Sequence, residues 1–221
     1  MAAVASSESM PGMNDETPKA DQDMSGFYTR YFKRYELLIE FKNLQHPSQC
    51  PPGIYIMPSP DNLNEWYGCL FIHKGFYARG VFKFVVKIPE SYPQLAPSVT
   101  FLTDMFHPLI DRFGNMDISH HFPTWRPRKD LISHVLKYVK ECFKESILSK
   151  LDENSVPNKD SLHMFVHERP LFAKLAAQCA TLSVSDSILY DSYLPNNPVK
   201  FAPIQESQIQ AILKQLEENN S

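Results

Sequence analysis

The sequence predicts an α+β fold in which an N-terminal helix, a four-stranded antiparallel meander and C-terminal helices follow one another along the chain. Three observations predict it: helical apolar spacing at residues 27–44, four short apolar segments separated by turn residues, and helical patterns after residue 130. The short connections between the apolar segments favour antiparallel pairing, because parallel strands need a crossover of about a dozen residues or more.

The first helix is predicted by apolar residues that recur at i, i+3 and i+4. These residues are Tyr28, Tyr31, Phe32, Tyr35, Leu38 and Ile39. Ser25 is a suitable N-cap and Pro47 closes the region. The pattern therefore indicates a helix over residues 27–44.

Four strands are predicted next, at Ile54–Met57, Trp66–His73, Val81–Ile88 and around Val99 and Phe101. The third strand alternates, so Phe82, Phe84, Val86 and Ile88 share one face. Lys83 and Lys87 lie on the other face, which we expect to be solvated. Phe84 is thus expected in the core.

Three helices are predicted after the sheet, at residues 130–143, 160–166 and 170–182. The first carries an apolar stripe and is a natural cover for one face of the sheet. Pro170 suits the first position of the last helix, because proline breaks a helix interior but not its start.

The chain divides into three zones, at residues 1–24, 25–182 and 183–221. The first has one lysine against five acidic residues and no periodicity, which predicts a disordered arm; a protein-binding acidic arm is the alternative. The third ends in a short helix with an apolar stripe of Ile209, Ile212, Leu213 and Leu216. Such a helix is marginal alone, so its stripe packs either on its own domain or on a partner.

Composition excludes several classes of function. A net charge of −3 gives no basic field for nucleic acid. No apolar run approaches the roughly 18 residues of a membrane span, no secretory signal is present, and no glycine-rich phosphate loop predicts a cofactor. The four cysteines lie far apart, which favours reduced thiols in the cytoplasm. His163 and His167 lack the glutamate of an HExxH motif, so no metal site is predicted.

Short motifs follow one another through the middle of the chain. Their residues are Tyr92, Pro93, Pro97, His107, Pro108, Gly114, Trp125 and Pro127. In order and spacing they resemble the YP turn, the xxPPxVxF strand, the FHPN motif and the WxP motif of the ubiquitin-conjugating (UBC) family, with Ala96 in place of one proline. The resemblance covers residues 27–182 and implies the UBC fold, with these residues as its framework and Trp125 as a core anchor.

Two departures from the family pattern concern its chemistry. Active members carry an asparagine after His-Pro, whose amide supports the oxyanion, and here this residue is Leu109. Their nucleophilic cysteine stands three residues after the glycine, and here that position is Asp117. A carboxylate does not replace a thiolate in thioester exchange. The resemblance therefore implies a ubiquitin-conjugating enzyme variant without catalytic residues.

Longer blocks resemble one inactive group, the Fused Toes family. They are GIYIMPS at residues 53–59, WYGCLFI at 66–72, GFYA with GVFKF at 75–84, and FHPLID with the following Met116-Asp117. The resemblance implies an adaptor that joins a Hook-type coiled-coil protein and an FHIP-type protein, links early endosomes and other vesicles to dynein and dynactin, and in animals binds Akt kinase. It implies a cytoplasmic protein, peripheral on vesicles through its partners.

Two alternatives stay open. One is a ubiquitin-binding or conjugation-assisting variant, and the other is an active enzyme that uses a displaced cysteine. Leu109 and Asp117 count against the second. Cys69 and Cys142 lie in a strand and on a helical apolar stripe, so both are expected to be core residues rather than nucleophiles.

Overall fold

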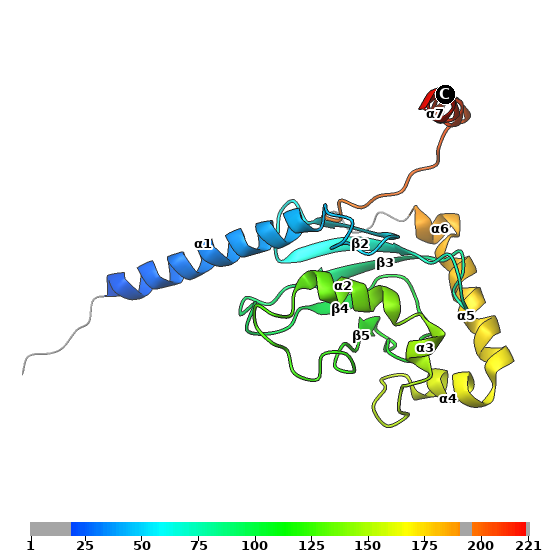
Figure 1. Ribbon diagram of the computed structural model, residues 1–221, viewed down its shortest axis with the longest axis horizontal. Helices are drawn as coiled ribbons and strands as arrows, with labels where there is room; N and C mark the ends of the chain where they lie inside the picture. The colour runs from blue at the N-terminus through cyan, green and yellow to red at the C-terminus, as the bar shows by residue number, and fades with distance from the viewer. Residues whose placement is uncertain (1–18, 191–195, 220–221) are drawn as a thin grey trace, which may run out of the picture. The chain divides into compact units, whose positions relative to one another are not determined.

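The computed structural model describes residues 19–190 and 196–219 (Figure 1). The chain separates into two compact units, Met1–Glu36 and Leu37–Ser221. Most of the predicted N-terminal arm, residues 1–18, lies outside the described residues. No helix of the described part is long and apolar enough to cross a bilayer.

Helix α1 (Lys19–Asn43) begins earlier than the sequence pattern predicts, so Ser25 lies inside it instead of capping it. Residues 19–24, expected in the disordered arm, are helical. In the first unit, Tyr31, Phe32 and Tyr35 are exposed. The apolar stripe that predicts the helix is therefore an exposed stripe over the residues whose side chains are described.

The second unit contains the sheet. Its strands are β1 (Ile54–Pro58), β2 (Glu65–Phe71), β3 (Val81–Lys87), β4 (Ser98–Phe101) and β5 (Asn115–Met116). Each strand pairs antiparallel with the next, in the order β1-β2-β3-β4-β5. The α+β class and the meander are confirmed. The fifth strand was not predicted, because two residues carry no recognisable alternation.

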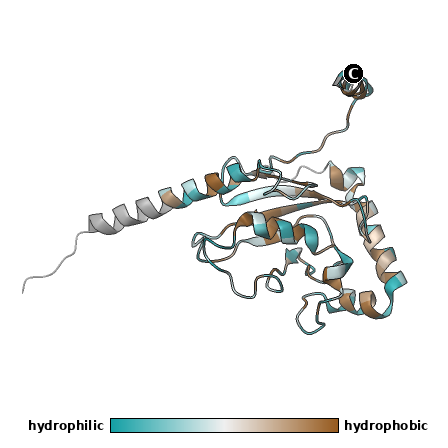
Figure 2. Ribbon diagram, viewed as in Figure 1, coloured by the Kyte–Doolittle hydropathy of each residue, from teal (hydrophilic) through white to brown (hydrophobic). Residues whose placement is uncertain are grey.

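The helices after the sheet are α2 (Ile132–Glu141), α3 (Glu145–Leu148), α4 (Lys159–His167), α5 (Arg169–Ser183), α6 (Asp186–Leu189) and α7 (Glu206–Asn219). Those predicted near residues 130, 160 and 170 are confirmed as α2, α4 and α5, with Pro170 in the first turn of α5. The single turns α3 and α6 are too short to show a period. Figure 2 shows hydrophilic and hydrophobic residues alternating along α2.

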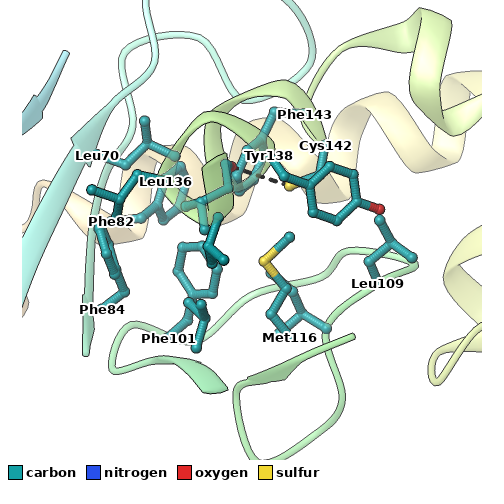
Figure 3. Packing of buried hydrophobic residues seen from close by; sticks show 14 of the residues in the cluster. Leu70, Phe82, Phe84, Phe101, Leu109, Met116, Leu136, Tyr138, Cys142 and Phe143 are labelled. Carbon is teal, nitrogen blue, oxygen red and sulfur yellow. Dashed lines mark hydrogen bonds between the residues drawn. The ribbon is translucent and has the colours of Figure 1, made fainter. Parts of the chain in front are cut away.

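The inner face of the sheet forms the core with α2 (Figure 3). Phe82 and Phe84 are fully buried there, as predicted for Phe84. Phe143, which follows α2, stacks on Phe82 with ring centroids 5.9 Å apart. Gly68 lies opposite Phe84, and a Cβ there would come within 2.6 Å of the Phe84 ring, so only glycine lets this ring cross the strand.

The outer face of β3 is covered as well, which corrects the expectation of a solvated lysine face. Lys83 is buried, and its Nζ donates a hydrogen bond of 2.8 Å to the carbonyl oxygen of Ile188. The same Nζ lies 5.8 Å from the ring centroid of Phe201. Only Lys87 is exposed, as expected. Residues of the C-terminal extension thus cover the part of the outer face around Lys83.

Candidate functional site

A hairpin places Leu109 and Asp117 side by side. The N–H of Asp117 donates to the carbonyl oxygen of Leu109 at 2.8 Å, and the N–H of Asp111 donates to Asn115 at 3.0 Å. The N–H of Gly114 closes the turn on the carbonyl oxygen of Asp111 at 3.0 Å. Leu109 and Asp117 therefore face each other across the hairpin.

The turn of this hairpin is fixed by a glycine and a carboxylate. Gly114 has φ +84°, and a Cβ there would come 2.2 Å from the carbonyl oxygen of Phe101. The Asp111 carboxylate accepts the N–H groups of Phe113 and Asn115, both at 2.8 Å. Desolvation acts to raise the pKa of Asp111, but hydrogen bonds from Asn115 and Phe113 outweigh it and lower this pKa. The carboxylate of Asp111 therefore stabilises the turn.

Leu109 belongs to the apolar core. It is fully buried and points inward beside Met116 and the hydroxyl end of Tyr138 (Figure 3). A leucine side chain has no hydrogen-bond donor for an oxyanion. The hydroxyl of Tyr138 is buried without a hydrogen-bond partner among the described residues. This side of the hairpin is thus apolar apart from the Tyr138 hydroxyl.

His107 holds the hairpin to the corner after α2. It is fully buried; one ring nitrogen, Nδ1, accepts the N–H of Leu109 at 3.1 Å, while Nε2 lies 3.2 Å from the carbonyl oxygen of Cys142. These partners assign the neutral tautomer with the proton on Nε2. Burial lowers the pKa of His107 to about 4, against the opposing effect of the hydrogen bond to Cys142. The ring of His107 therefore links the hairpin to the end of α2.

Asp117 is half-exposed and its carboxylate is used locally. Its Oδ1 accepts the N–H of Ser119 at 2.8 Å, which starts the loop that leads toward α2. In this loop the His121 ring stacks on Tyr138 at 4.7 Å, and the Phe122 ring contacts Trp125 at 5.6 Å. A half-exposed carboxylate with a local hydrogen bond can act as neither thiol nor oxyanion donor.

All four cysteines lie in the described part of the chain as free thiols. Cys69 and Cys142 are buried, as predicted, while Cys50 and Cys179 are half-buried. Burial raises the pKa of each of the four thiols, that of Cys69 to about 11. Reactive cysteines require a lowered pKa. Among the described residues, no group of three or more histidine, cysteine or acidic residues is placed to hold a metal ion.

The remaining framework residues converge on the start of α2. The Glu40 carboxylate accepts the hydroxyl of Tyr92 at 2.5 Å and the N–H of Ile132 at 2.9 Å, so it caps the positive end of α2. Trp125 Nε1 donates to the carbonyl oxygen of Pro93 at 2.8 Å. No sequence pattern predicted the role of Glu40, because one glutamate on a helix looks like any other.

The other residues singled out in the sequence lie at different depths in the structure. Trp125 is half-buried rather than a core anchor, since it packs at the edge of the apolar cluster. Pro97 and Pro108 are buried, whereas Pro127 is exposed. The predicted stripe of α7 is also exposed: Ile209, Ile212, Leu213 and Leu216 show between 38% and 54% of their surface.

A known protein family matches the part of the chain that carries these motifs. The sequence model of the family described as ubiquitin-conjugating enzyme matches residues 36–180. The chain belongs to the ubiquitin-conjugating enzyme family.

Relatives confirm the resemblance to Fused Toes proteins. "Protein crossbronx" of Drosophila mojavensis is 32% identical over 192 residues, covering 83% of this chain and 77% of that protein. "Protein crossbronx homolog" of Anopheles gambiae is 32% identical and covers 76% and 73%. "Protein AKTIP homolog" of Nematostella vectensis is 30% identical over 80% of this chain, which spans 56% of that protein's length.

Proposed function

We propose that this protein is a non-catalytic adaptor built on the ubiquitin-conjugating fold. The observation that carries the proposal is the pair of Leu109 and Asp117, which face each other across one hairpin at the oxyanion and nucleophile positions. Neither side chain can perform the chemistry of its position. The raised pKa of every thiol argues against a displaced nucleophile.

Exposed apolar stripes support a protein-binding role. One lies on α7 and another on α1, where Tyr31, Phe32 and Tyr35 are exposed at 59–62%. Aromatic residues gathered on an exposed surface are typical of interfaces. Spacing at i, i+3, i+4 and i+7 on α7 is that of a helix that lies in an apolar groove or against a coiled coil. An adaptor needs such surfaces, whereas an enzyme needs a cleft at its reactive group.

The resemblance to the Fused Toes family implies the partners. We propose that the chain joins a Hook-type coiled-coil protein and an FHIP-type protein in a complex that links early endosomes or other vesicles to dynein and dynactin. An Akt-type kinase is a further proposed partner, in line with the resemblance. The protein would then act in the cytoplasm and reach vesicles through its partners.

A thioester assay tests the non-catalytic part. The purified full chain, incubated with ubiquitin, activating enzyme and ATP, should form no adduct that a reducing agent cleaves. Asp117→Cys should at most accept ubiquitin without efficient transfer to lysine, because Leu109 offers no donor. A reducer-sensitive adduct on the unchanged chain overturns this part of the proposal.

Co-precipitation from native cells tests the adaptor part. The full chain should capture Hook and FHIP homologues, and Ile212→Asp with Leu216→Asp should abolish capture through the α7 stripe without changing the melting temperature. The control, Ser207→Asp with Gln210→Asp, adds the same charge to the polar face of α7. Capture of ubiquitin or an active conjugating enzyme in place of Hook and FHIP proteins would favour the conjugation-assisting alternative.

A further inference from the structure

A cavity of about 740 Å³ opens beside the connection between β2 and β3, where it meets the end of α2. Its floor is apolar and consists of Phe71, Ile72, Phe76, Phe143 and Ala173. All of these except Phe143 are only half-buried in the described structure. Ligand sites commonly have this size and an apolar lining. The cavity can therefore receive one or two apolar side chains.

The rim of this cavity is positively charged. Lys74, Lys140 and Lys144 surround the floor. The one acidic residue of the rim, Glu145, is ion-paired with Arg169. Lys140 Nζ donates to the backbone carbonyl of Pro52, which is a neutral acceptor. The rim thus keeps an excess of positive charge above an apolar floor.

Arg169 also holds the floor in place. Its guanidinium lies 5.7 Å from the ring centroid of Phe76 and 4.8 Å from that of Phe165. The Phe76 ring in turn packs edge-to-face on Phe172, with centroids 5.2 Å apart. These contacts fix Phe76 before any ligand arrives, which lowers the entropy lost on binding.

A second cavity, of about 420 Å³, lies on the other side of the same lysines. It is formed by residues 47–52 and by His134, Lys137 and Glu141 of α2, and it shares Lys140 and Lys144 with the first cavity. We call the two cavities and their shared lysines the α2 groove. Two cavities joined by a cationic bridge suit an elongated ligand better than a compact small molecule.

The charge of the α2 groove is opposite to that of the whole chain. Among the described residues that line the groove, Lys74, Lys137, Lys140 and Lys144 stand against two acidic residues, Glu141 and Glu145, which leaves two positive charges in excess. The whole chain has a net charge of −3. Glu141 is moreover engaged with Lys144 at 3.3 Å. An acidic ligand would therefore be attracted to the lysines of this groove.

We propose that the α2 groove binds an acidic peptide segment of a partner protein, with an apolar side chain in the first cavity and carboxylates over the lysines. The inference rests on the proposed adaptor function and specifies the chemistry of one partner segment. It concerns a surface separate from the α7 stripe, which allows the two to be tested apart. Its affinity should fall as salt rises, because exposed charge pairs are screened.

A selection from a random peptide library on the full-length protein tests the inference. Selected peptides should be rich in aspartate and glutamate together with leucine or phenylalanine. Fluorescence anisotropy of the labelled peptides should then show a loss of at least about tenfold in affinity for Lys74→Glu with Lys140→Glu. The matched control, Lys129→Glu with Lys150→Glu, makes the same charge change outside the groove and should bind as the wild type does.

The apolar part of the groove needs its own variant. Ala173→Phe fills the first cavity without changing charge and should weaken the same peptides severalfold, while the melting temperature reports whether the domain still folds. Selected peptides without acidic enrichment, or equal binding to the charge-reversed variant, overturn the inference. The inference is also overturned if no peptide is selected and phosphatidylserine vesicles bind through Lys74 and Lys140. The ligand of the groove is then a membrane surface.

Failure of the inference and failure of the adaptor proposal give different results. If Lys74→Glu with Lys140→Glu leaves peptide binding intact while the α7 variant still loses Hook and FHIP homologues, only the groove is excluded. If the full chain captures no such homologue but the selected acidic peptides bind as expected, the groove stands as a peptide site and the partner assignment is wrong.

Discussion

The two faces of strand β3 are covered in different ways. The inner face presents fully buried Phe82 and Phe84 to a dense cluster that includes α2 and Phe143. The outer face is covered around Lys83 by single groups, the carbonyl oxygen of Ile188 and the ring of Phe201. Dense packing makes the inner face the main source of stability, and we expect the outer cover to open more readily than the core.

The largest effect should come from the inner face. Phe84→Ala removes a fully buried ring opposite Gly68 and should lower the free energy of unfolding by about 3–5 kcal/mol, through lost burial and the cavity that remains. Urea unfolding followed by tryptophan fluorescence measures it. Met57→Ala, at a half-exposed side chain, is the control and should cost less than about 1 kcal/mol. If Phe84→Ala also cost less than about 1 kcal/mol, Phe84 would not belong to the core.

Acid should weaken the inner cluster through His107. The pKa of this residue is about 4 in the folded chain, below its ordinary value of 6.5. The unfolded chain therefore binds the extra proton first, and stability is lost as the pH falls from about 6.5 to about 4, by up to about 3 kcal/mol. Denaturation curves across this range measure the slope. His107→Gln should flatten it, and an unchanged slope would assign the effect to other groups.

Trp125 should matter less than Phe84, because it is half-buried at the edge of the cluster. We expect Trp125→Ala to cost about 2 kcal/mol through partial loss of ring burial and of the hydrogen bond to Pro93. Trp125→Phe keeps an aromatic ring and isolates the hydrogen bond, at about 1 kcal/mol. The same urea titration applies, and a loss equal to that of Phe84→Ala contradicts the assignment to the edge.

The smallest effect should come from the outer face. Phe201→Ala removes the ring contacts to Phe71 and Lys83 and should change global stability by about 1 kcal/mol or less. Trypsin should nonetheless cut after Lys200 faster, because the cover opens locally. Val199→Ala is the control on the same segment. An unchanged cleavage rate would mean that Phe201 does not hold the cover down.

The sequence predicted the inner face and missed the outer one for a physical reason. Alternation in β3 is a local pattern, so Phe84 could be assigned to the core directly. The burial of Lys83 depends on Ile188 and Phe201, more than a hundred residues later in the chain. A periodic pattern shows which residues share one face of a strand, but it does not show which residues pack against that face.

In helix α1, too, a local pattern predicted the element but not what packs against it. Here the predicted apolar face is exposed, whereas in β3 the predicted solvated face is covered. The spacing in α1 predicted the helix correctly, yet Leu38 and Ile39 of the predicted stripe are exposed, and in the second unit Leu37 and Leu44 are buried instead. Motif spacing singled out Leu109 and Asp117, but their pairing across one hairpin was not predicted. The α2 groove joins loops and helices far apart in the sequence, and no local pattern announces it.

The contacts of Lys83 bear on where this protein can be shortened. A chain ending at residue 182 would lack the Ser183 hydroxyl that accepts the N–H of Val81, as well as the carbonyl of Ile188 and the ring of Phe201. Its sheet would then present a newly exposed apolar surface around Phe71, which invites self-association and low solubility. Shortened forms intended for crystallisation or binding measurements should therefore retain the chain through Phe201.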